Sequence, residues 1–162
     1  MIRYVKIFLV LSLGFWGLIG TVGNLSEIPV VYGAVKDVAS MANVPDGVGP
    51  PFRVSSPFII WAGVVLIVLG KLVALVGGLG GGAVMLKHVN GSADEFARSK
   101  KLAIAGCGAT FGLLILSFTI IAEGAFFMFY DPKYVGAGEI AFRFAGSFGL
   151  IGLFVAQRET DS

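Results

Sequence analysis

Residues 54–86 read VSSPFIIWAGVVLIVLGKLVALVGGLGGGAVML, thirty-three positions with a single charge, Lys71. A helix that crosses a bilayer needs about 20 mostly apolar residues. Three further stretches are similar, because 7–26 and 102–122 carry no charge and 140–157 carries only Arg143. The sequence therefore predicts one all-α transmembrane domain over residues 1–162. We expect a four-transmembrane-helix bundle, with spans at about 5–25, 57–86, 101–129 and 139–157.

Composition agrees with a membrane protein. Apolar residues make up 56% of the chain and charged ones 14%, against about 25% charged in soluble domains. The mean hydropathy is +0.89. A net charge of +2 is too small to indicate a nucleic-acid partner. Cys107 is the only cysteine, so an internal disulfide is excluded.

The first apolar stretch has a second interpretation. Arg3 and Lys6 followed by an apolar run also describe a secretory signal. That run is long for a signal, and the nearest approach to a small-residue cleavage site is Thr21-Val22-Gly23. We therefore expect an uncleaved span.

The basic residues predict the orientation of the spans. Cytoplasmic loops of membrane proteins carry an excess of Lys and Arg. With the N-terminus inside, the inner segments hold Arg3, Lys6, Lys87, Arg98, Lys100, Lys101 and Arg158, and the outer segments hold Lys36, Arg53 and Lys133. Both termini are therefore predicted to be cytoplasmic, with membrane lipids as the surrounding partner.

The first outer loop contains a helical pattern. Val31, Val35, Val38 and Ala42 recur at helical spacing. Pro29 suits the first turn of a helix, and Ser26 or Asn24 is a candidate cap. We expect a short amphipathic helix at about 28–42, either covering the spans or binding a partner.

Glycine occurs 24 times, about twice its usual share of ~7%, and mostly inside the apolar stretches. Small residues let transmembrane helices approach closely. The candidate packing positions are Gly78 and Gly82, Gly108 and Gly112, and Gly146 and Gly149. Packing within the bundle and docking against another protein both remain open for them.

The second apolar stretch is longer than a helix needs to be to cross a bilayer. At about 1.5 Å per residue, a helix over 57–86 measures about 45 Å, against a hydrocarbon core of about 30 Å. The helix must tilt, project inward or loosen near the glycine run 77–82, and we expect it to project.

Three charges lie in or near the spans: Lys71, Glu123 and Arg143. Intramembrane charges are costly and usually have a partner. Glu123 and Arg143 fall at similar depths, so we expect them to form a structural ion pair. Lys71 can share it if residues 53–58 stay outside the hydrocarbon. A contact with a partner subunit and an ion path are the alternatives.

Aromatic residues crowd the outer ends of the spans, as in an interfacial belt or a protein-docking rim. They are Phe52, Phe58, Trp61, Phe126, Phe127, Phe129, Tyr130, Tyr134, Phe142 and Phe144.

Several motifs together resemble a bacterial family of unknown function, the predicted small integral membrane proteins. In the first outer loop the matching residues are Asn24-Leu25-Ser26-Glu27, Val35, Val38, Ser40-Met41, Arg53 and Ser56-Pro57. In the second half they are Glu123, Phe127, Met128 and Ala141-Phe142-Arg143-Phe144. The resemblance implies a four-span protein of the bacterial inner membrane and implies no reaction.

The chain departs from that family pattern at four places. Lys71 stands where the family has an acidic residue, Asp37 where it has histidine, and Ala42 where it has aspartate. Phenylalanines replace the tryptophans that follow the glutamate matched by Glu123. We therefore expect that whatever the tryptophans and the acidic residue do in relatives is altered in this chain.

The chain offers little for catalysis. An enzyme needs a nucleophile with a base, a metal set or paired carboxylates, and this chain has one histidine, His88, and one cysteine. We expect no enzyme activity, no cofactor and no metal. The favoured function is an accessory or structural subunit that packs against a larger membrane complex, such as a respiratory or other oxidoreductase assembly. The alternative is a self-associating bundle that conducts a small solute or ion.

Overall fold

The computed structural model describes residues 1–49 and 53–159. Its helices follow the order α1 Ile2–Ser26, α2 Ile28–Ala39, α3 Pro57–Leu75, the π-helix η1 Val76–Gly80, α4 Gly81–Lys87, α5 Ala93–Ser99, α6 Lys101–Leu114, the π-helix η2 Ile115–Ala125, the 3-10 helix η3 Met128–Tyr130 and α7 Val135–Ala156. No strand occurs in this part of the chain. The predicted all-α fold is confirmed.

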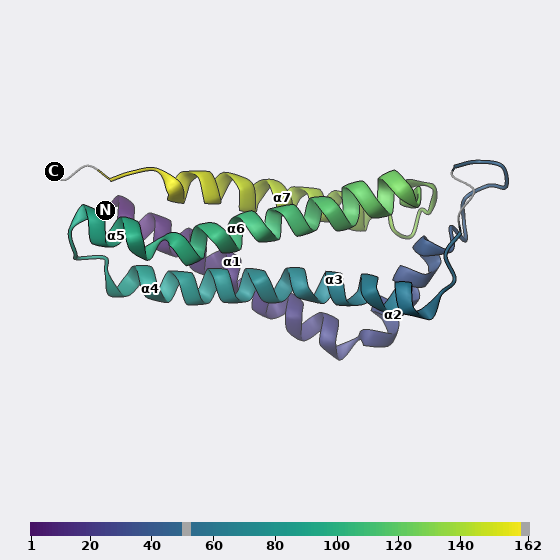
Figure 1. The fold of residues 1–162 in the computed structure, drawn as a ribbon, viewed down its shortest axis with the longest axis horizontal. Coiled ribbons are helices and arrows are strands. Elements are labelled where there is room, and N and C mark those ends of the chain that lie inside the picture. Colours follow the sequence, from purple (N-terminus) through teal and green to yellow (C-terminus); the bar gives the residue numbers. More distant parts are fainter. Residues whose placement is uncertain (50–52, 160–162) are drawn as a thin grey trace.

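Four helices within the described residues are long and apolar enough to cross a membrane: Ile2–Ser26, Pro57–Lys87, Ala93–Ala125 and Val135–Ala156. They lie side by side along one axis (Figure 1). The first span packs on the second, the third on the fourth, and the second on the third. Lipid offers the backbone no hydrogen bonds, so a helical bundle is the expected solution.

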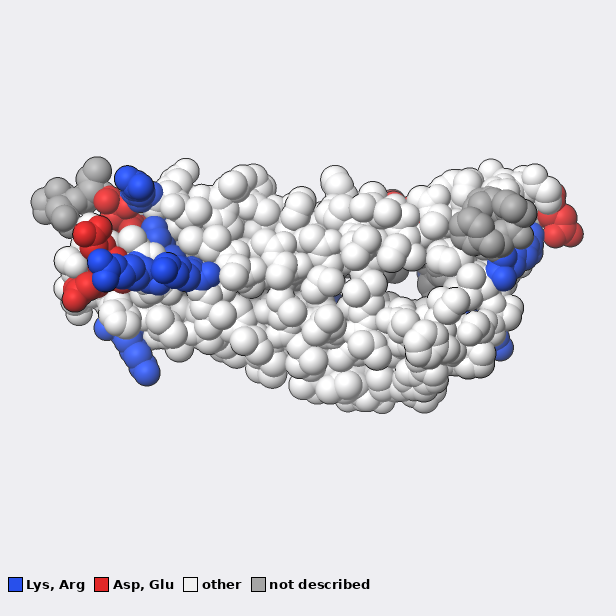
Figure 2. All heavy atoms as spheres, in the orientation of Figure 1, with Lys and Arg blue, Asp and Glu red and all other residues white. Residues whose placement is uncertain are grey.

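Both termini and α5 lie at one end of the bundle, which we call the terminal end, and α2 lies at the other, the α2 end (Figure 1). Charged side chains gather at these two ends, with an almost uncharged band between them (Figure 2). Large apolar side chains such as Leu150 and Leu153, about 70% exposed, project from that band. This distribution suits a bundle whose middle faces acyl chains.

Glycine contacts hold the first three spans close together. A Cβ added to Gly78 would fall on the backbone of Gly14 in α1, and one added to Gly77 would fall on that of Gly106 in α6. One on Gly17 would meet the backbone of Leu75. The segment η1 is therefore wedged between α1 and α6, an approach that side chains would prevent.

The second span forms one continuous helical rod over Pro57–Lys87, but it loosens over Val76–Gly80 into a π-helix. Projection alone was the sequence-based expectation, and the structure adds this local widening at the glycine run. Glycine lowers the local cost of such a departure because it has no side chain to restrict the backbone.

Several helix ends differ from the sequence-based expectation. The helix α1 begins at Ile2 rather than about 5, and α7 begins at Val135 rather than about 139. The third span was expected to run to 129 but ends at Ala125, because Phe127 adopts a left-handed conformation with φ 53° before the 3-10 turn. The helix α2 ends at Ala39 rather than 42, and Glu27 occupies its N-cap position without a side-chain capping hydrogen bond. Ser26, one of the two candidate caps, instead donates its hydroxyl to the carbonyl of Val22 in α1.

Candidate functional site

A cavity of about 170 Å³ lies inside the bundle. All four spans line it, with the residues Trp16, Asn24, Leu66, Ile67, Gly70, Lys71, Leu113, Leu114, Ser117, Phe118, Ala137, Ile140, Ala141 and Phe144. Most of this lining is apolar, and a few polar groups interrupt it. That composition is typical of small-molecule sites.

One face of α1 builds the wall opposite Lys71. Trp16, Gly20 and Asn24 follow one another at four-residue intervals, so they lie on the same side of the helix. A Cβ on Gly20 would lie 2.7 Å from Cδ of Lys71. Because Gly20 has no side chain, the aliphatic part of the Lys71 side chain can lie directly against α1 at this position.

The ammonium of Lys71 rests on aromatic rings. Its Nζ lies 3.3 Å from the centre of the Trp16 ring and 5.9 Å from that of Phe144. The two rings also contact each other, with centroids 4.5 Å apart. No hydrogen bond or ion pair to this ammonium is found in the described part of the chain. Its neighbours therefore supply cation–π attraction but no counterion.

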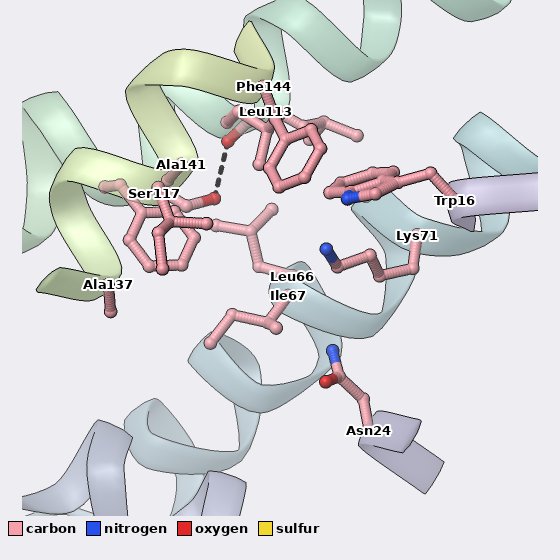
Figure 3. Close-up of a pocket in the computed structure, with 14 residues that line it drawn as sticks. Trp16, Asn24, Leu66, Ile67, Lys71, Leu113, Ser117, Ala137, Ala141 and Phe144 are labelled. Atoms are coloured by element: carbon pink, nitrogen blue, oxygen red, sulfur yellow. Dashed lines mark hydrogen bonds between the residues drawn. The ribbon is translucent and has the colours of Figure 1, made fainter. Parts of the chain in front are cut away.

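A second donor reaches the same space. The Nδ2 atom of Asn24 is buried and has no hydrogen-bond partner among the described residues. Figure 3 shows the Lys71 amine and the Asn24 amide extending into the cavity from α3 and α1. Ser117 is already committed, because its hydroxyl donates to the carbonyl of Leu113 at 2.6 Å.

The expected ion pair between Glu123 and Arg143 is not formed. Arg143 instead pairs with Glu139, one turn away on α7, with Nη2 and Oε2 3.4 Å apart and both side chains more than 60% exposed. The carboxylate of Glu123 lies against Gly138 in α7. No ion pair to Glu123 or Lys71 occurs within residues 1–49 and 53–159. The similar depth of Glu123 and Arg143 in the membrane therefore did not bring their side chains together.

The glycine pairs separate into two groups. Gly78 and Gly82 face α1, where Gly82 meets the side chain of Leu11. Gly108, Gly112 and Gly146 are exposed, and a Cβ on any of them would meet nothing within 4 Å. Gly149 packs under the ring of Phe111. Packing within the bundle thus accounts for Gly78 and Gly82. It gives no role to Gly108 and Gly112.

A cluster at the terminal end was missed by sequence reasoning. The Nζ atoms of Lys6 and Lys100 lie 2.6 Å and 3.2 Å from the Glu159 carboxylate, and all three side chains are at most 5% exposed. Both ammonium groups also donate to the carbonyl of Gln157. Burial raises the pKa of Glu159, but the two lysines outweigh it and hold that pKa below its ordinary value. The cluster ties the start, the middle and the end of the chain together.

A polar network joins the α2 end. Tyr134 donates its hydroxyl to Asp37 of α2 at 2.7 Å. The Asn43 amide donates to Asp131 at 2.6 Å. These bonds hold α2 and the loop after it against the segment that precedes α7, so the predicted short outer helix is anchored to the bundle. Phe52, a member of the predicted aromatic rim, lies outside the described residues.

Comparison with known proteins gives one family match. The model of the family described as predicted small integral membrane protein (DUF2165) matches residues 2–158. No curated protein and no solved structure matches the chain.

Proposed function

The chain belongs to the predicted small integral membrane protein family, and we propose that it is an accessory or structural subunit of a larger membrane protein complex, such as a respiratory or other oxidoreductase assembly, and not itself an enzyme. In this proposal it resides in the bacterial inner membrane with both termini in the cytoplasm. The basic residues of the terminal end support that orientation.

The observation that carries the proposal is an unoccupied small-residue face on α6. Ala105, Gly108, Ala109 and Gly112 are all exposed and repeat at the four-residue spacing that brings transmembrane helices into close contact. Gly78, Gly82 and Gly149 already have partners within the bundle. A transmembrane helix of another protein is the occupant that this flat face suits.

Exposed aromatic side chains at the α2 end add a second contact surface, the aromatic rim: Phe58, Trp61, Phe129, Tyr130 and Phe142, between 41% and 82% exposed. Aromatic residues are enriched both at membrane interfaces and at the cores of protein interfaces. In the proposed complex the rim contacts the outer part of the partner.

The experiment replaces the α6 face and recovers the complex. Gly112→Leu and Gly108→Leu fill the face, and Gly23→Leu is the matched control, because Gly23 is also helical, exposed and without a neighbour within 4 Å. After extraction in mild detergent, we expect both α6 variants to lose co-purifying membrane proteins while Gly23→Leu retains them. Equal recovery from all three variants would overturn the proposal.

A second candidate, a self-associating bundle that passes a small solute or ion, is favoured by the Lys71 cavity. Reconstitution of the purified protein in liposomes tests it. Flux that is lost in Lys71→Met and kept in Glu123→Gln would favour this candidate.

A further inference from the structure

We propose that the cavity beside Lys71 binds the carboxylate of a small amphiphilic acid, with Lys71 and Asn24 as its donors. All fourteen lining residues come from this chain, so the site is complete without the partner of the proposed complex. Binding there can therefore succeed or fail separately from that assembly.

The first argument is the position of the charge. Lys71 is the fifteenth of the 31 residues of its span, about 21 Å along the helix from Pro57. A cation near the bilayer centre is costly and usually has a charged partner. Cation–π contact with Trp16 offsets only part of that cost. An anionic ligand supplies the compensation that the lining lacks.

The second argument is the set of polar groups. The lining contains no aspartate or glutamate. Its free groups are donors, since the Asn24 amide nitrogen is buried without a partner and the Lys71 ammonium has only ring contacts. A carboxylate accepts from both and is the complementary group. A cation or a pure hydrocarbon would leave one or both donors unmatched.

The third argument is size and lining. A cavity of roughly 150 Å³ in another protein holds benzene, and this one measures about 170 Å³. Leu66, Ile67, Leu113 and Ile140 supply apolar walls. The cavity therefore holds a carboxylate with about six carbons of its apolar chain, and the rest of a longer acid must extend out of the cavity. The ligand enters either as a free acid from water or as a fatty acid from the bilayer, with the carboxylate as the shared chemistry.

Trp16 provides the reporter. The chain has two tryptophans, and Trp61 lies away from the cavity, beside Tyr32 at a centroid distance of 5.1 Å. Trp61→Phe therefore leaves one emitter, directly under the Lys71 ammonium. The purified full chain is placed in phosphatidylcholine nanodiscs and titrated with hexanoate in one arm, and oleate is added to the bilayer in the other.

We expect saturable quenching or shift of Trp16 emission in at least one arm, and the arm that responds identifies the source. Hexanamide, which keeps the size but lacks the charge, should bind at least about tenfold more weakly than hexanoate. Oleamide in the bilayer is the matching control for oleate. These comparisons use a chain with both donors intact, so they decide the matter even if a donor variant does not fold.

Donor variants then locate the site in that background. Lys71→Met should weaken binding about tenfold or more, and Asn24→Leu about fivefold. Lys36→Met removes the same charge from an exposed position on α2 and should leave binding unchanged. Absence of saturation in both arms, equal binding of acid and amide, or an unaffected Lys71→Met would each overturn the proposal.

Discussion

Gly78→Ala is the sharpest test of how the bundle is held together. The added Cβ falls on the backbone of Gly14, which unlike a side-chain tip cannot rotate away. Ordinary Cβ contacts begin at 3.4 Å, so α1 and η1 must separate by about 1 Å. A gap of that order forfeits a quarter to a half of the dispersion energy of the atoms facing it.

The expected cost is about 1–3 kcal/mol, the usual range for overpacking, or about fivefold to 160-fold in the folding equilibrium. Gly108→Ala is the matched control, because its methyl group enters open space and alanine favours the helix by up to about 1 kcal/mol. Reversible unfolding in mixed micelles with increasing dodecyl sulfate measures both. If the two variants are equally stable, close backbone contact does not hold α1 in place.

Three further predictions concern the ends of the bundle. Glu159→Gln leaves the buried ammonium groups of Lys6 and Lys100 without a carboxylate, and should cost about 1–3 kcal/mol in the same unfolding assay; no loss would contradict the cluster. Because the pKa of Glu159 is lowered on folding, its contribution is complete above the unfolded value of about 4.3 and lost as pH falls through the lower folded value. As pH falls below about 5, the unfolding midpoint of wild type should therefore drop more steeply than that of Glu159→Gln, and parallel curves would contradict this. Tyr134→Phe removes the bond to Asp37, should cost about 1 kcal/mol, and should speed proteolysis of the loop after α2; an unchanged cleavage rate would argue against anchoring.

The spans are the part of the fold that sequence predicts well. Long apolar stretches have one structural solution in lipid, because every backbone polar group must be satisfied within the segment. The π-helical segments over Val76–Gly80 and Ile115–Ala125 were beyond such reasoning. Hydropathy fixes which residues are in the membrane, but not how many residues make each turn.

The charges show a second limit. Glu123 and Arg143 lie at similar depth, yet depth leaves the direction around the helix axis undetermined. The four-residue spacing of Glu139 and Arg143 was an available signal for the pair that the structure contains. The cavity had a weaker signal, the spacing of Trp16 and Asn24 on one face of α1. Only tertiary structure brings that face opposite Lys71.

The Lys6–Glu159 contact also has a consequence for biogenesis. Its two residues are separated by 153 positions, so all four spans must leave the ribosome before the two residues can meet. Until then the first and third spans carry ammonium groups that lack their anion. Closure of the bundle is thus a late event in membrane insertion, and nascent chains arrested before residue 159 should be the ones that quality-control proteases recognise.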